Sequence, residues 1–233
     1  MTFQLEVLPH GDWATAVADL WADRLSGKPE LTMCLPTGST PKPVYRAIAG
    51  HADFSKAKVF LLDEFGLEPR DPGRCDVMLE EMLFSRLDAQ PAFDRLDPQA
   101  PDLDAECERY SAAIAQDGIG LTMLGLGANG HLGFNEPGSE YDSTTRVVAL
   151  ANETIAGLGS YGTMSTTSWG MTMGLAEILS SDEVWLLVSG EHKAQILRRT
   201  LVGPVDTDVP ASFLRMHSNV IVWVDEAAAS QLV

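Results

Sequence analysis

The chain has 233 residues, of which 45% are hydrophobic, and its formal net charge is −17 at pH 7. This length allows one large domain or two small ones, and the hydrophobic content is ample for a buried core. The negative charge argues against a nucleic-acid partner, because such binding depends on neutralising phosphates. No 18-residue apolar run predicts a membrane-spanning segment.

The N-terminal stretch and the cysteines fit the expectation of a cytoplasmic protein. The stretch from Met1 to His10 contains Glu6 and lacks the basic and then apolar pattern of an export signal. Cys34, Cys75 and Cys107 are scattered and form no CxxC pair, which argues against a disulfide framework or a structural zinc site. The histidines are also spread without metal-ligand spacing, so we expect no metal.

Apolar runs alternate with helical patterns along the whole chain. This alternation predicts an α/β fold: a single Rossmann-like, doubly wound, mainly parallel sheet with helices on both faces, in one domain spanning residues 1–233. The expected strands are 3–8, 31–35, 58–62, 121–124, 145–150, 183–188 and 219–224, and the expected helices are 13–25, 42–49, 76–87, 104–116 and 191–201.

The loop after the strand at 31–35 has the composition of a phosphate site. It contains Thr37, Gly38, Ser39 and Thr40 and leads directly into the helix expected at 42–49. Backbone N–H groups and small hydroxyls at a helix N-terminus can all point at an anion, and the helix dipole favours negative charge.

Two further strands end in polar residues. Asp63 and Glu64 follow the strand at 58–62, and a glycine-rich stretch, 125–137, follows the strand at 121–124. That stretch places His131 and Glu136 among glycines that let the backbone approach a ligand. Because ligands of open parallel sheets bind beyond the carboxyl ends of the strands, we expect one shared crevice.

The segment 152–169 interrupts the alternation, since it is rich in glycine, serine and threonine. Long loops in compact domains are often lids or are disordered. The segment is therefore either a mobile lid over the crevice or an ordinary flexible connection.

With these motifs the chain resembles the glucosamine-6-phosphate deaminase/isomerase family, which includes galactosamine-6-phosphate deaminases and is related to 6-phosphogluconolactonases. The resemblance spans about Leu31 to Val224, and the run from His131 to Pro137 favours a deaminase over a lactonase. Two other segments, Pro72–Cys75 and Pro210–Asn219, look more like the galactosamine branch. The matching segments are Leu35–Pro41, Leu62–Phe65, Gly125–Pro137 and Gly190–Ala194.

The resemblance implies a reaction that opens the pyranose, moves a proton between C2 and C1 and expels the C2 amine as ammonia. It implies that Asp63 is the base at C2, that His131 opens the ring, and that Glu136 orients the imidazole and shares its charge. Asn129 stands where many members carry Asp, and Lys193 matches a lysine that reaches the phosphate. No step needs a metal or an organic cofactor, and the implied partner is a small sugar phosphate.

The chain departs from the family pattern at two places. A gapless comparison puts Ser160 where many members carry a phosphate-binding arginine of the lid, and Arg146 is the nearest arginine. Val148 and Ala149 fall where allosteric members carry a basic cluster, which predicts hyperbolic kinetics without an effector.

Three questions stay open at this stage: the kind of activity, the sugar epimer and the oligomeric state. A lactonase or a non-catalytic sugar-phosphate sensor could use the same fold, although a sensor would not need Asp63, His131 and Glu136 together. The epimer at C4 of the sugar is undecided. The chain could be a monomer or a homo-oligomer.

Overall fold

The computed structural model describes residues 3–232. Residues 1–2 and 233, which the expected domain and the N-terminal prediction include, lie outside the described residues. The main sheet has seven strands in the order β1-β10-β9-β6-β2-β3-β5, and its neighbouring strands run parallel. These strands are β1 (Gln4–Leu8), β2 (Thr32–Leu35), β3 (Lys58–Leu61), β5 (Ala92–Asp94), β6 (Leu121–Gly125), β9 (Glu183–Val188) and β10 (Val220–Asp225).

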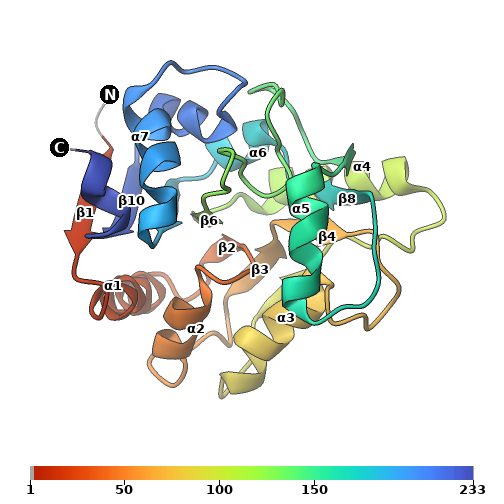
Figure 1. The fold of residues 1–233 in the computed structure, drawn as a ribbon. Coiled ribbons are helices and arrows are strands. Elements are labelled where there is room, and N and C mark those ends of the chain that lie inside the picture. The colour runs from red at the N-terminus through yellow and green to blue at the C-terminus, as the bar shows by residue number, and fades with distance from the viewer. Residues whose placement is uncertain (1–2, 233) are drawn as a thin grey trace.

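Helices cover both faces of this sheet, which confirms the expected doubly wound α/β fold (Figure 1). Side chains alternate across each strand, so that Met33 and Leu35 of β2 enter one core and Cys34 enters the other. One face carries α1 (Trp13–Gly27), α2 (Lys42–Ile48) and α3 (Cys75–Met82), and the other carries α4 (Leu103–Asp117), α6 (Leu175–Leu179) and α7 (Ala194–Val202).

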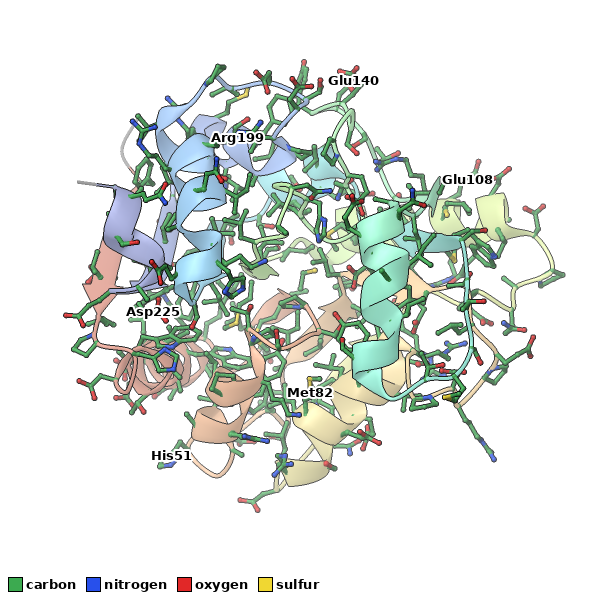
Figure 2. The ribbon with its side chains drawn as sticks, in the orientation of Figure 1. His51, Met82, Glu108, Glu140, Arg199 and Asp225 are labelled. Carbon is green, nitrogen blue, oxygen red and sulfur yellow. The ribbon has the colours of Figure 1, made fainter. Side chains whose placement is uncertain are left out.

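The side chains drawn in Figure 2 make the two layers visible. Met82 at the end of α3 lies on the lower side of the view, whereas Arg199 of α7 and Glu108 of α4 lie above the sheet. The two core clusters lie on opposite faces of the sheet, so the loops at the ends of the central strands are the places where a ligand can meet them.

The strand order reverses between β2 and β6. From β2 the chain adds β3 and β5 on one side, and from β6 it adds β9 and β10 on the other side. The loops that follow these two central strands diverge at such a switch point and leave a crevice at the carboxyl edge. The phosphate-type loop and the glycine-rich loop are the two loops that flank it.

A second, three-stranded antiparallel sheet lies at this edge, in the order β4-β8-β7. It consists of β4 (Asp63–Phe65), β8 (Trp169–Thr172) and β7 (Arg146–Ala149). The chain passes from β3 into β4 through Leu62, so the expected strand at 58–62 continues into this sheet. Asp63 therefore lies on a strand that pairs with Thr172 of β8 rather than in a loop.

The segment 152–169 contains more regular structure than its composition suggests. It begins with α5 (Asn152–Gly157) and the 3₁₀ helix η2 (Leu158–Tyr161), and Trp169 already belongs to β8. Leu158 is only 1% exposed, and Ile155 packs on the core. These apolar contacts hold α5 and η2 in place. They were not apparent from the sequence, because the two residues stand among glycines.

Other elements differ from the prediction at their boundaries. The helix expected at 76–87 ends at Met82 and is followed by the 3₁₀ helix η1 (Phe84–Arg86), and the helix expected at 191–201 starts as the 3₁₀ helix η3 (Glu191–Lys193). The sequence did not predict β5, β8 or α6, which have three to five residues each, nor the 3₁₀ helices η4 (Pro210–Met216) and η5 (Ala228–Gln231). Within residues 3–232, no helix combines the length and the apolar character needed to cross a bilayer.

Candidate active site

A cavity of about 480 Å³ opens at the carboxyl edge of the sheet. Its walls are the loops after β2 and β6, the start of β4, the helical segment α5–η2 and the side chain of Lys193. It is large enough for a small phosphorylated ligand. All of the expected site residues except Glu136 line it, namely Thr37, Gly38, Ser39, Thr40, Asp63, Asn129, His131 and Lys193.

Asp63 is buried, with 7% of its surface exposed, although its carboxyl group faces this cavity. Burial raises the pKa of Asp63 to about 6, against the lowering effects of a hydrogen bond from the Cys75 thiol and the nearby His131. A carboxylate with a pKa near neutral can both take and return a proton. Asp63 is thus equipped for general acid–base chemistry.

His131, Glu136 and Asn129 form one hydrogen-bonded group. Glu136 Oε2 lies 3.2 Å from His131 Nδ1 and accepts a hydrogen bond of 2.9 Å from Asn129 Nδ2. Asn129 Oδ1 in turn accepts a hydrogen bond of 3.1 Å from the backbone N–H of His131. Because a backbone N–H can only donate, this contact fixes the orientation of the amide, and a carboxamide is the group that satisfies both partners.

Glu136 lies behind His131 and outside the cavity lining. Burial alone would raise the pKa of Glu136, but hydrogen bonds from His131, Thr154 and Asn129 lower it to about 2. The ionised carboxylate accepts a hydrogen bond from Nδ1–H of His131, which leaves the other ring nitrogen free to exchange a proton with a ligand.

Thr154, on α5, contributes the shortest of these contacts. Its hydroxyl donates to Glu136 Oε1 at 2.6 Å, so the helical segment over the cavity is bonded directly to the partner of the imidazole. The sequence pointed to this segment as a lid but gave no reason to single out Thr154, because the contact joins residues from separate elements.

Two glycines allow the loops to approach closely. A Cβ atom on Gly127 would lie 2.3 Å from the His131 ring. Gly133 has a φ of +58°, and a Cβ there would lie 2.9 Å from Thr172 Oγ1 and 3.4 Å from Asp63 Oδ2. Larger residues at these positions would displace the imidazole from its place or push the glycine-rich loop away from β4.

The phosphate-type end of the cavity consists of the loop 37–40 and Lys193. Gly38 takes a φ of +99°, which glycine adopts readily. Lys193 Nζ donates to the Leu126 carbonyl at 2.7 Å, which holds the ammonium group at the cavity wall. Burial lowers the pKa of Lys193.

Glu64 does not line the cavity, but it binds the start of α3, which contributes Cys75 to the cavity wall. Its carboxylate accepts hydrogen bonds of 2.8 and 3.0 Å from the backbone N–H groups of Cys75 and Asp76, at the start of α3. Burial and the neighbouring Asp76 raise the pKa of Glu64, against the lowering effect of Arg74. Through this contact Cys75, another cavity residue, is held beside Asp63.

The two positions where the chain departs from the family pattern lie outside this cavity. Ser160 donates to the Gly157 carbonyl at 2.6 Å and is absent from the cavity lining. Arg146 donates to Asn135 and Ser139, at 2.9 and 3.1 Å, and lines a separate cavity of about 430 Å³ together with Val148 and Ala149. Arg146 therefore does not take the place of the lid arginine.

Several cavity residues were missed by sequence reasoning: Phe65, Phe134, Glu153, Thr154 and Tyr161. The two phenylalanines flank motif residues, and the other three come from α5 and η2. No group of three or more His, Cys, Asp or Glu side chains within the described part of the chain could hold a metal ion.

Fold and site together define a doubly wound α/β protein whose switch-point cavity combines an acid–base group with an anion-type loop. The chain belongs to the family described as glucosamine-6-phosphate isomerases/6-phosphogluconolactonase, which matches residues 11–223. The resemblance stated from the motifs is thereby confirmed, and so is the prediction that the chain is an enzyme.

Two relatives at 40% identity are both named as glucosamine-6-phosphate deaminases. The chain is 40% identical to a glucosamine-6-phosphate deaminase of Rhodopirellula baltica over 240 residues, covering 98% of this chain and 96% of the relative. It is 40% identical to glucosamine-6-phosphate deaminase 2 of Bacillus subtilis, covering 90% and 89% of the two chains.

Solved structures give the same family. A structure described as a monomeric glucosamine-6-phosphate deaminase matches with a TM-score of 0.93 at 34% identity, covering 98% of this chain and 100% of that one. A 6-phosphogluconolactonase from Thermotoga maritima matches with a TM-score of 0.78 at 22% identity, covering 96% and 99% of the chains. The latter likeness concerns the fold alone.

Proposed function

We propose that this enzyme converts glucosamine 6-phosphate and water into a ketohexose 6-phosphate and ammonia. The observation that carries the proposal is the position of Asp63, a buried carboxyl group with a pKa of about 6 in the same cavity as the His131–Glu136 pair. The names of the relatives with 40% identity support this substrate.

In the proposed reaction, His131 opens the pyranose. Its free ring nitrogen takes the proton of the O1 hydroxyl and delivers it to the ring oxygen as the bond from C1 to that oxygen breaks, and Glu136 balances the charge on the imidazolium formed in between. Asn129 and Thr154 hold Glu136 in place for this step. The product is an open-chain amino aldehyde with its C2 proton exposed to a base.

Asp63 then takes the C2 proton and returns it to C1. The electron pair released at C2 forms a double bond to C1 while O1 takes a proton from the C2 ammonium group, and reprotonation at C1 leaves an iminium at C2. Water adds to that carbon and passes one proton to the nitrogen, the C2–N bond breaks to release ammonia, and loss of the second water proton leaves the C2 ketone. A buried base suits this transfer, because burial raises its pKa to about 6, close enough to neutral for the group both to take a proton and to return it.

The phosphate of the substrate is assigned to the loop 37–40 and Lys193. The backbone turn at Gly38 and three hydroxyl groups offer hydrogen-bond donors, and the lysine supplies a positive charge at the cavity wall. This places the sugar between the phosphate loop and Asp63, with C1 and C2 toward the glycine-rich loop.

Galactosamine 6-phosphate is the second candidate substrate. It is favoured by Cys75, which ends the galactosamine-type segment Pro72–Cys75 and lines the cavity beside Asp63. The two sugars differ only at C4, so both can present the same C1, C2 and phosphate groups to the residues named above.

The deciding experiment is an ammonia-release assay with both amino sugar phosphates side by side, using Asp63→Asn as the control for background release. We expect ammonia from at least glucosamine 6-phosphate, and none with the control variant. Hydrolysis of a sugar-phosphate lactone without ammonia release would instead assign the protein to the lactonases. Tight binding of either sugar phosphate without turnover would indicate a sensor.

A further inference from the structure

Tyr161 brings an aromatic hydroxyl to the phosphate-type end of the cavity. It is the last residue of η2 and lines the cavity. A Cβ atom built on Gly38 would lie 3.6 Å from the Tyr161 hydroxyl oxygen. The phenol therefore reaches the turn of the loop 37–40 from the opposite wall of the cavity.

The ring of Tyr161 is fixed while its hydroxyl faces the cavity. Its ring centroid lies 6.3 Å from that of Phe65, at an interplanar angle of 44°. Burial raises the pKa of Tyr161, and the neighbouring Cys75 and Asp63 raise it further, whereas no hydrogen bond contributes to the shift. The hydroxyl thus stays protonated and is available as a donor to a ligand.

The other polar side chains that α5 and η2 bring near the cavity are suited to other tasks. Thr154 donates its proton to Glu136, and Ser160 donates to the Gly157 carbonyl away from the cavity. Glu153 is an acid and would repel an anion. Among the described residues of this segment, Tyr161 is therefore the one placed to recognise a phosphate.

We propose that the Tyr161 hydroxyl donates a hydrogen bond to the phosphate group of the bound sugar, opposite the loop 37–40, and is a specificity-determining residue of this enzyme. The inference rests on the proposed function, since it assumes a phosphorylated ligand in this cavity. It also gives α5 and η2 a direct contact with the ligand.

A neutral donor has consequences that a cation would not have. Lys193 attracts the phosphate through charge, which salt screens, whereas a hydrogen bond from a phenol is short-ranged and depends on geometry. Loss of the hydroxyl should weaken binding by a similar factor at low and at high salt. Loss of the Lys193 charge should weaken binding by a larger factor at low salt than at high salt.

The test compares wild type with Tyr161→Phe, which keeps the ring and its packing on Phe65. The probe is 2-amino-2-deoxyglucitol 6-phosphate, with binding measured by titration calorimetry. We expect its Kd to rise roughly ten-fold, as for the loss of a hydrogen bond to a charged group. The KM of the amino sugar phosphate should rise by the same factor, with a smaller change in kcat.

Two controls separate phosphate recognition from other effects. Ser160→Ala, at the neighbouring position, should leave the Kd unchanged, and thermal melting of both variants checks their fold. The same alcohol without phosphate should bind wild type and Tyr161→Phe equally. Unchanged affinity of Tyr161→Phe for the phosphorylated alcohol would overturn the proposal, and so would an equal loss on both alcohols, because the hydroxyl would then contact the sugar.

Inorganic phosphate as a second probe separates this inference from the proposed reaction. If Tyr161→Phe weakens phosphate binding while wild type releases no ammonia, Tyr161 recognises phosphate and the reaction assignment fails. If ammonia is released but phosphate binds both proteins equally, the reaction holds and the inference about Tyr161 is wrong.

Discussion

At the acid–base end of the cavity, side chains of the glycine-rich loop and of α5 hold one another, whereas the phosphate end is mainly a backbone turn with small hydroxyls. Glu136 accepts from Asn129 and Thr154 and pairs with His131, and Asp63 lies buried on β4 beside Cys75. The loop 37–40 instead offers separate donors around Gly38. A connected group loses its function when one member is removed, whereas independent donors are lost one at a time.

The largest effect is expected at Asp63, because the proposed proton transfer from C2 to C1 passes through this one carboxyl group. We predict that Asp63→Asn lowers kcat by roughly 10²–10⁴-fold, the usual range for loss of a general base, and leaves substrate affinity nearly intact. Steady-state ammonia release and calorimetric binding measure the two quantities. A variant that kept more than about a tenth of the wild-type kcat would remove Asp63 from the proton transfer.

His131→Gln is expected to have the second largest effect, and one that depends on the form of the substrate. Glutamine can still accept or donate a hydrogen bond but cannot transfer a proton at neutral pH. We predict a greater loss of kcat on the ring form than on an analogue supplied mainly in open-chain form. Equal losses on both forms would contradict the ring-opening role.

Asp63 and His131 also show how much of the site could be predicted from the sequence. The strand ends and glycine motifs were local signals, so the parallel sheet and the cavity residues on its loops were predictable from order and spacing. Thr154 and Tyr161 were not, because their contacts with Glu136 and Gly38 join segments far apart in the chain. The glycine-rich composition also gave no sign of α5 and η2, where Ile155 of α5 and Leu158 of η2 pack on the core.

Thr154→Val tests the connection between α5 and the acid–base group. Valine keeps the shape but removes the 2.6 Å hydrogen bond to Glu136. We predict a drop in kcat of roughly five- to twenty-fold, as for the loss of about one hydrogen bond to a charged group, with a smaller change in KM. Thr154→Ser should restore most of the rate, and a variant equally impaired with serine would indicate a packing role for the methyl group.

The pKa of Asp63 predicts opposite effects of pH on activity and on stability. Its pKa in the folded protein is raised from 3.8 to about 6, so ionisation penalises the folded state. The penalty is absent below the unfolded value, grows as pH rises between the two values, and reaches about 3 kcal/mol above the folded value. Activity should rise over the same range, because the base must be ionised.

The check is a pair of melting curves at pH 5 and pH 8 for wild type and Asp63→Asn. Asparagine mimics the protonated acid, so the variant should gain several degrees over wild type at pH 8 and less at pH 5. Comparing the two proteins at each pH removes the contributions of Glu64 and the other titrating groups. An Asp63→Asn protein less stable than wild type at pH 8 would contradict the burial penalty.

The smallest effect is expected in the segment 152–169. Here a bound ligand should change how often the segment opens, which is measured by hydrogen exchange rather than by the catalytic rate. Its α5 has no fully buried residue, so it should open more easily than the sheet, and we predict that a bound sugar phosphate slows its opening. Hydrogen exchange with and without 2-amino-2-deoxyglucitol 6-phosphate measures this. Protection should increase in α5 and η2, through Thr154 and Tyr161, and stay constant in β9. Slow exchange throughout the segment in the free enzyme, unchanged by the ligand, would mean that it is ordinary packed structure and not a lid.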